Sequence, residues 1–94
     1  KTDTKTQLYS LAKVAGKRST DKPIYILTSR QTFSAAEAFA YTLKHWGRAT
    51  VVGEITAGGA NRTKRINLND SFTISLPYIK AIHPLTKTNW EGKT

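Results

Sequence analysis

The sequence contains no cysteine, and only six of its 94 residues are acidic. The absence of cysteine excludes disulfide bonds, thiolate metal sites and cysteine nucleophiles. No apolar run approaches the roughly 20 residues that a membrane-spanning helix needs, and the polar segment that begins at Lys1 has no signal-peptide core. A chain of this length has room for one domain with a modest hydrophobic core.

Basic residues outnumber acidic ones, with fifteen Lys and Arg in the sequence. Such an excess raises the question of a nucleic acid or an anionic membrane surface as a partner. However, the basic residues are spread from Lys1 to Lys93, and the one tight cluster is Arg62, Lys64 and Arg65. No zinc-finger spacing, aromatic RNA-binding signature or helix-turn-helix pattern accompanies them. We therefore expect a solvated basic surface and no specific nucleic-acid partner.

The first 22 residues are mostly polar and are predicted to form an entering loop or a short helix. Leu8, Leu11, Ala12 and Ala15 fall at helical spacing, but the run is short for a stable helix. We expect the core strands, the helix and a hairpin to lie in residues 23–94.

A strand, a helix and a second strand are predicted next. Residues 23–28 form a continuous apolar, β-branched and aromatic run, which is typical of a strand covered on both faces. Residues 35–46 are predicted to be helical, with Phe39, Leu43 and Trp46 on one stripe, and Gly47 is expected to end the helix. With a second strand at 48–53, this order predicts a parallel βαβ unit.

An antiparallel hairpin is predicted after the glycine-containing loop at 56–61. Ile66 and Leu68 alternate with polar residues, and Asn69-Asp70 marks a turn. Alternation resumes in residues 72–76, and Pro77 is expected to break the strand before residues 78–82 become extended again.

Ser34 lies at the corner between the first strand and the helix, and two interpretations of it remain open. As a capping box, Ser34 would accept a hydrogen bond from the Glu37 amide while the Glu37 carboxylate binds the Ser34 amide. As a nucleophile, it would lie at the carboxyl edge of the sheet beside helix amides that stabilise an oxyanion. A nucleophile needs a general base, for which the chain offers His45, His83 or a lysine. None of them is compelling, because His45 is too far along the helix and His83 lies in a loop of undetermined position.

Three ordered blocks of the sequence carry a family resemblance. They are residues 24–40, which include Thr32-Phe33-Ser34-Ala35-Ala36-Glu37, then 47–60 and 88–92. Together they resemble the tail-specific (C-terminal processing) serine peptidase superfamily, and most of all its branch related to the tricorn protease core and the interphotoreceptor retinoid-binding protein repeats. The resemblance implies an α/β chain with the Clp protease and crotonase-like spiral ββα fold, present here as a partial domain.

The same resemblance implies roles for individual residues. Ser34 matches the nucleophile, and Ala35 matches the residue whose backbone N–H forms half of the oxyanion hole. The processing-protease branch has a catalytic lysine where this chain has Gly59, which favours the tricorn-like branch instead. In that branch a glutamate near the end of the domain matches Glu91. Gly58 and Gly59 are expected either to permit a turn or to line the substrate cleft.

The general base is then expected to be a histidine upstream of Lys1, and the chain to be the C-terminal part of a catalytic domain that is inactive by itself. The resemblance implies a serine peptidase that acts on peptides or proteins without a cofactor or metal. It also implies an extracytoplasmic location in a bacterium, either periplasmic or membrane-associated. The alternative is a non-catalytic module of the same fold that binds a peptide or another ligand.

Overall fold

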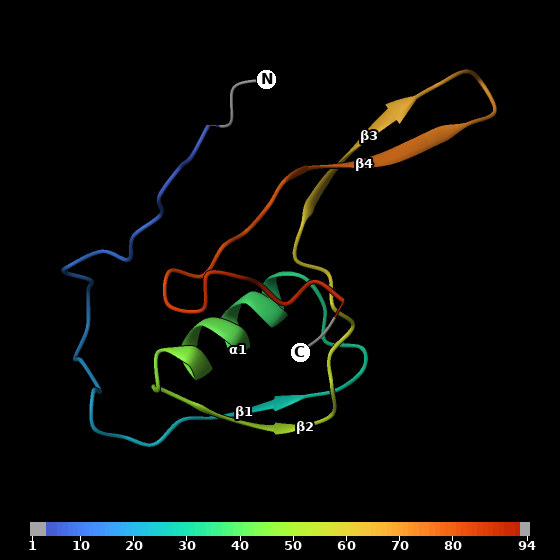
Figure 1. Cartoon of the computed structure of the whole chain (residues 1–94). Helices are drawn as coiled ribbons and strands as arrows, with labels where there is room; N and C mark the ends of the chain where they lie inside the picture. The colour runs from blue at the N-terminus through green and yellow to red at the C-terminus, as the bar shows by residue number, and fades with distance from the viewer. Residues whose placement is uncertain (1–3, 93–94) are drawn as a thin grey trace.

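The computed structural model describes residues 4–92 and contains one helix and four strands within them (Figure 1). The strands form two separate two-stranded sheets. The elements are β1 (Tyr25–Thr28), α1 (Ala35–His45), β2 (Thr50–Gly53), β3 (Arg62–Asn67) and β4 (Thr73–Ile79).

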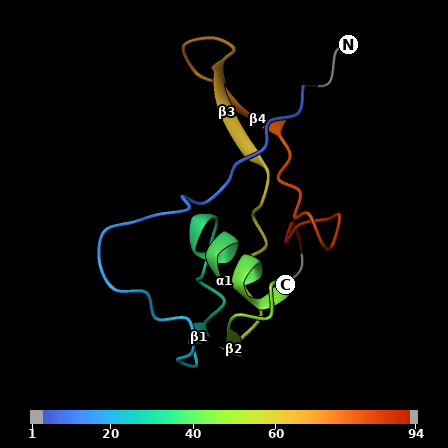
Figure 2. The same ribbon diagram turned by 90° about the vertical axis from the view of Figure 1, so that its left-hand side faces the viewer.

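The predicted strand, helix and strand unit is present. β1 and β2 are parallel, with Tyr25 paired to Thr50 at one end and Thr28 paired to Gly53 at the other. The helix α1 connects them and lies over one face of the pair (Figures 1 and 2). Because parallel strands end at the same edge, the turn after β1 and the loop after β2 leave the sheet side by side.

The expectation that the first strand is covered on both faces is wrong. Tyr25 and Leu27 are 67% and 80% exposed, whereas Ile24 and Ile26 are half-buried. Alternate residues of a strand point to opposite faces, so these values show that only the face toward α1 is covered among the described residues.

The apolar stripe that the sequence predicts on the helix is not its buried face. Phe39 and Trp46 are 58% and 52% exposed, whereas Glu37, Ala40 and Tyr41 are buried. The buried set lies on the opposite side of the helix, because that side faces the loop after β2 and the C-terminal segment. Hydrophobic spacing identified the helix correctly but not its orientation.

The hairpin is formed by β3 and β4, which pair antiparallel with Ile66 opposite Ile74. It extends away from the rest of the molecule (Figures 1 and 2). Contrary to expectation, Pro77 lies within β4 and does not end it. The pairing shifts register between Arg62 and Thr63, opposite Pro77, and such an irregularity accommodates a residue without an N–H donor.

No helix or strand forms in residues 4–22. Leu8 and Leu11, which have helical spacing, are 92% and 76% exposed. A helix of this length is marginal in water unless its apolar face packs against something, and no described element covers these side chains.

A small core joins the C-terminal segment to α1. Its buried members are Tyr41, Ala60 and Trp90, and the rings of Tyr41 and Trp90 have centroids 5.6 Å apart. The Tyr41 hydroxyl also lies 2.9 Å from Oγ1 of Thr86. These contacts bring the segment around Trp90 back to the loop that follows β2, next to the turn that carries Ser34.

Candidate active site

Ser34 lies at the corner between β1 and α1 in an unusual backbone conformation, with φ of 56° and ψ of −112°. A positive φ is uncommon for a residue with a side chain and indicates local strain. The preceding turn is held by a hydrogen bond from the Thr32 amide to the Ser29 carbonyl oxygen at 2.9 Å. Both Ser34 and the following Ala35 are exposed, so the corner presents a serine and the start of a helix to solvent.

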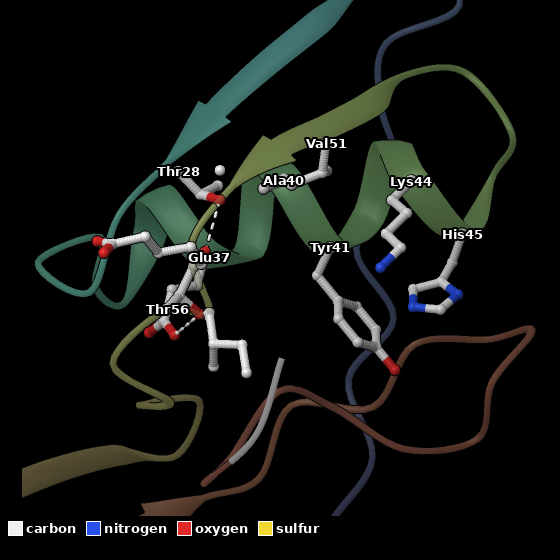
Figure 3. A pocket seen from close by; sticks show the side chains of 11 residues that line it. Thr28, Glu37, Ala40, Tyr41, Lys44, His45, Val51 and Thr56 are labelled. Atoms are coloured by element: carbon white, nitrogen blue, oxygen red, sulfur yellow. Dashed lines mark hydrogen bonds between the residues drawn. The ribbon is translucent and has the colours of Figure 1, made fainter.

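The carboxylate of Glu37 connects this corner to the loop after β2. Its Oε2 accepts hydrogen bonds from the amide N–H groups of Ser34, at 2.7 Å, and Gly59, at 3.0 Å. Its Oε1 accepts from the Thr56 hydroxyl and the Gly58 amide, both at 2.6 Å. Figure 3 shows Glu37 and Thr56 meeting in this way. Glu37 is 0% exposed, so one buried carboxylate fixes the serine and the glycine loop together.

The environment of Glu37 favours its charged form. Burial by itself raises the pKa of this carboxyl, but the hydrogen bonds that it accepts outweigh burial, and the pKa is lowered from the ordinary value of 4.5. The donors responsible are Thr56, Gly59, Gly58 and Ser34. A buried carboxylate with four donors and no cationic partner among the described residues is stabilised chiefly by these dipoles.

A second carboxylate, that of Glu91, binds the far end of the same loop. Its Oε2 accepts from the amides of Ala60, at 2.6 Å, and Asn61, at 2.8 Å. The neighbouring Trp90 donates its indole N–H to the carbonyl oxygen of Gly59 at 3.0 Å. The C-terminal segment therefore holds the loop from one side, while Glu37 holds it from the other.

Gly58 permits the close approach of the C-terminal segment. Its φ is 85°, and its carbonyl oxygen accepts a hydrogen bond from the Gly92 amide at 2.7 Å. A Cβ atom at position 58 would lie 2.9 Å from the Gly92 backbone, closer than side chains allow. Glycine is thus required here both by conformation and by space.

The structure gathers the residues that the sequence predicted for the site. The amides of Ser34, Gly58 and Gly59 donate to the Glu37 carboxylate, and Ala35 follows Ser34 as the first residue of α1. Glu91 reaches the same loop from the C-terminal segment and binds its far end. Ser34 and Glu91 share no hydrogen bond with each other in the described part of the chain. The Ala35 amide, the first of α1, has no hydrogen-bond acceptor among the residues that the structure describes.

The two histidines lie at the other end of α1. The ring of His45 packs 4.2 Å from that of Tyr41 and 5.8 Å from that of His83, measured between centroids. Burial, with smaller contributions from the charge of Lys44 and from His83, lowers the pKa of His45. Neither ring contacts Ser34, so within residues 4–92 no histidine is placed as its general base. The described residues also contain no group of three or more His, Asp or Glu able to hold a metal ion.

A pocket of about 220 Å³ lies between α1 and the segment that follows β2. Figure 3 shows the side chains of Tyr41 and His45 extending from α1, and Thr56 beside Glu37, to which it is hydrogen-bonded. Ser34 does not line this pocket. Glu37, whose carboxylate binds the Ser34 amide, is one of the residues that line it.

Glu37 is the residue whose importance the sequence showed only in part. The Ser-x-x-Glu spacing predicted its bond to the Ser34 amide. It gave no signal for the bonds from Thr56, Gly58 and Gly59, since these donors are 19 to 22 residues away in the sequence. A buried carboxylate near a glycine loop is identified only once the fold brings them together.

Comparison with protein families agrees with the resemblance noted in the sequence. The model described as peptidase family S41 matches residues 1–93, which is nearly the whole chain. The matched region includes the serine turn, the glycine loop and the segment with Glu91. The chain therefore belongs to peptidase family S41, the family of the tail-specific, C-terminal processing peptidases.

Proposed function

We propose that this chain is the C-terminal part of the catalytic domain of a serine peptidase in which Ser34 is the nucleophile. Membership of a peptidase family implies peptide or protein substrates. The observation that carries the proposal is the strained, exposed Ser34 at a strand-to-helix corner, beside an Ala35 amide without an acceptor among the described residues. Strained serine corners of this kind present a nucleophile to substrate.

In this proposal the Ser34 hydroxyl attacks the scissile carbonyl carbon, and the Ala35 amide donates to the oxygen that becomes negative. A histidine outside these 94 residues takes the proton from Ser34. Glu37 contacts neither substrate nor the reacting atoms and is a positioning residue, because its carboxylate binds the Ser34 amide from the buried side.

Glu91 is proposed to support the hydrogen bonding of that histidine. Its Oε2 is engaged by the Ala60 and Asn61 amides, whereas its Oε1 accepts no hydrogen bond from any described residue. Oε2 therefore anchors the carboxylate to the loop, and Oε1 can accept a hydrogen bond from a neighbouring part of the domain. A glutamate that is fixed but exposed suits this role.

The fold and location are proposed on the same basis. The parallel pair β1 and β2, with α1 crossing over one face, suits the Clp protease and crotonase-like spiral ββα architecture. No helix in the described residues has the length and apolar character needed to cross a membrane. An extracytoplasmic site in a bacterium is proposed from the family resemblance, and fractionation of cells that express the natural protein tests it.

A non-catalytic binding module of the same fold is the competing function. Ser34 and Glu37 form a helix capping box, in which the Glu37 carboxylate accepts from the Ser34 amide and the Ser34 side chain faces the Glu37 amide, and a cap needs no chemistry. In that case Ser34→Ala would cost about 1 kcal/mol of stability and leave ligand binding intact.

Peptide hydrolysis distinguishes the two functions. The longest natural form of the polypeptide, which supplies the histidine, is compared with its Ser34→Ala variant on a mixture of unstructured peptides, with products identified by mass spectrometry. The proposal predicts that cleavage by the variant falls at least a thousandfold. Equal cleavage by the two proteins would show that Ser34 is not the nucleophile.

A further inference from the structure

The side chain of Phe33, immediately before the proposed nucleophile, is 59% exposed. Its ring lies directly against Gly59, so that a Cβ atom built on Gly59 would overlap the ring and lie 2.6 Å from its Cζ atom. Gly59 is not among the glycines with a positive φ. The absence of a side chain at position 59 is therefore explained by the aromatic ring and not by the backbone conformation.

The peptide under the ring is held in place. The Gly59 amide donates to Glu37, and its carbonyl oxygen accepts from the indole of Trp90, each at 3.0 Å. One part of the Phe33 ring thus rests on a fixed backbone, while the rest faces solvent one residue away from Ser34. A large exposed aromatic side chain that is supported in this way is a preformed apolar contact surface.

The Phe33 ring also makes part of the surface beside Ser34 apolar. Any side chain at position 59 would have to displace the ring, so the phenyl group occupies space that a longer residue there would use. Where the ring covers Gly59, the surface beside Ser34 is consequently apolar. An aliphatic or aromatic side chain gains free energy by covering the ring, whereas a carboxylate would lose hydration without gaining a partner.

We infer that Phe33 is a specificity-determining residue, which selects peptides with an apolar side chain next to the scissile bond. The inference rests on the proposed function, since it takes Ser34 as the nucleophile. A substrate side chain that covers the ring with one or two more methylene groups than its competitor is expected to be preferred about tenfold in kcat/KM.

The test uses the longest natural form of the polypeptide and two series of peptides. One series varies the residue before the cleaved bond among Leu, Phe, Ser and Asp, and the other varies the residue after it. In one of the series, the ratio of kcat/KM for the Leu and Ser peptides is expected to fall about tenfold in Phe33→Ala. This ratio does not depend on the folded fraction of the variant, so partial unfolding does not obscure the result.

Two further variants sharpen the comparison. Gly59→Ala keeps the Phe33 side chain, but the new methyl group displaces its ring from the loop. This variant is therefore also expected to lower the ratio of kcat/KM for the Leu and Ser peptides. Phe39→Ala removes a phenylalanine of similar exposure, 58%, from α1, and is expected to leave the ratio unchanged.

The outcomes separate this inference from the proposed function. If the wild type cleaves peptides, Ser34→Ala does not, and Phe33→Ala keeps the wild-type ratio in both series, then the role of Phe33 is wrong and the nucleophile stands. If Ser34→Ala cleaves as well as the wild type, or if the wild type cleaves no peptide, then the proposed function is wrong and this inference with it.

Discussion

The backbone nitrogen of Ser34 lies 2.7 Å from Oε2 of Glu37, and this carboxylate also binds the amides of Gly58 and Gly59. The position of the serine is therefore coupled to a loop more than twenty residues away in the sequence. A bond that looks like ordinary helix capping in the sequence is one of four around a fully buried charge.

Replacing Glu37 with Gln is expected to destabilise the protein by about 3 kcal/mol. Each carboxylate oxygen accepts from two donors, so the amide –NH₂ group of Gln must face two donors and leaves both without an acceptor. Urea unfolding followed by circular dichroism measures the change.

The matched control is Glu54→Gln. Glu54 is an exposed carboxylate that accepts from the Arg30 amide and lies 3.8 Å from the Arg30 guanidinium. Since exposed ion pairs contribute little, this variant is expected to lose no more than about 1 kcal/mol. Equal losses in the two variants would contradict the central role of Glu37.

The contribution of Glu37 is also expected to depend on pH. Because its pKa is lowered below the ordinary value of 4.5 on folding, the folded state binds fewer protons than the unfolded state in acid. The stabilisation is fully present above about pH 5.5 and is lost as the pH falls through 4.5 toward the lower folded pKa. The difference in unfolding free energy between wild type and Glu37→Gln should thus shrink between pH 7 and pH 3. A difference that stays constant over this range would show that the folded carboxyl is not favoured in its charged form.

Gly53→Ala is expected to disrupt the parallel pair. Gly53 has φ of 130°, and a Cβ atom there would overlap the carbonyl oxygen of Thr28, its pairing partner. The expected loss is more than about 3 kcal/mol, since both the conformation and the space are unfavourable. Gly47→Ala is the control, because Gly47 has φ of 68° and open space around it, so only the conformational cost of about 1 kcal/mol applies. Thermal unfolding of both variants gives the comparison, and similar melting temperatures would contradict the proposed clash.

Substitutions of Glu91 can distinguish its structural role, which is to bind the glycine loop, from its proposed role in supporting the catalytic histidine. In Glu91→Gln the side-chain carbonyl oxygen still accepts from the Ala60 and Asn61 amides, so stability is expected to change by less than about 1 kcal/mol. Peptide cleavage by the longest natural form is expected to fall at least tenfold, because the charge that supports the histidine is gone. Glu91→Ala should lose both stability and cleavage. Full activity in the Gln variant would show that Glu91 only anchors the loop.

Local sequence patterns predicted which elements form but not which sides of them are buried. The βαβ order and the hairpin follow from hydrophobic periodicity and from glycine and turn residues. Phe39 and Trp46 were expected on the packed stripe of α1 and are exposed, whereas Glu37 and Tyr41 are buried. The buried side of a helix is set by the segments that reach it through the fold, and here these are the loop after β2 and the segment around Trp90.

The residues of the candidate site were predicted from family resemblance, and the structure explains why they occur together. Gly58 and Gly59 lie in one loop, which Glu37 holds from one side and Glu91 from the other. The contact between Phe33 and Gly59 has no sequence signature, because it depends on how the serine turn meets that loop. The catalytic roles of Ser34, Ala35 and Glu91 stay predictions.

Covalent labelling of Ser34 tests the central claim most directly. The longest natural form of the polypeptide is incubated with a fluorophosphonate, digested, and mapped by tandem mass spectrometry, with Ser34→Ala as the control. We predict one adduct, on Ser34, whose formation parallels the loss of peptide cleavage and is absent in the variant. Loss of cleavage with the adduct on a different residue, or full cleavage by a protein labelled at Ser34, would contradict the assignment of Ser34 as the nucleophile.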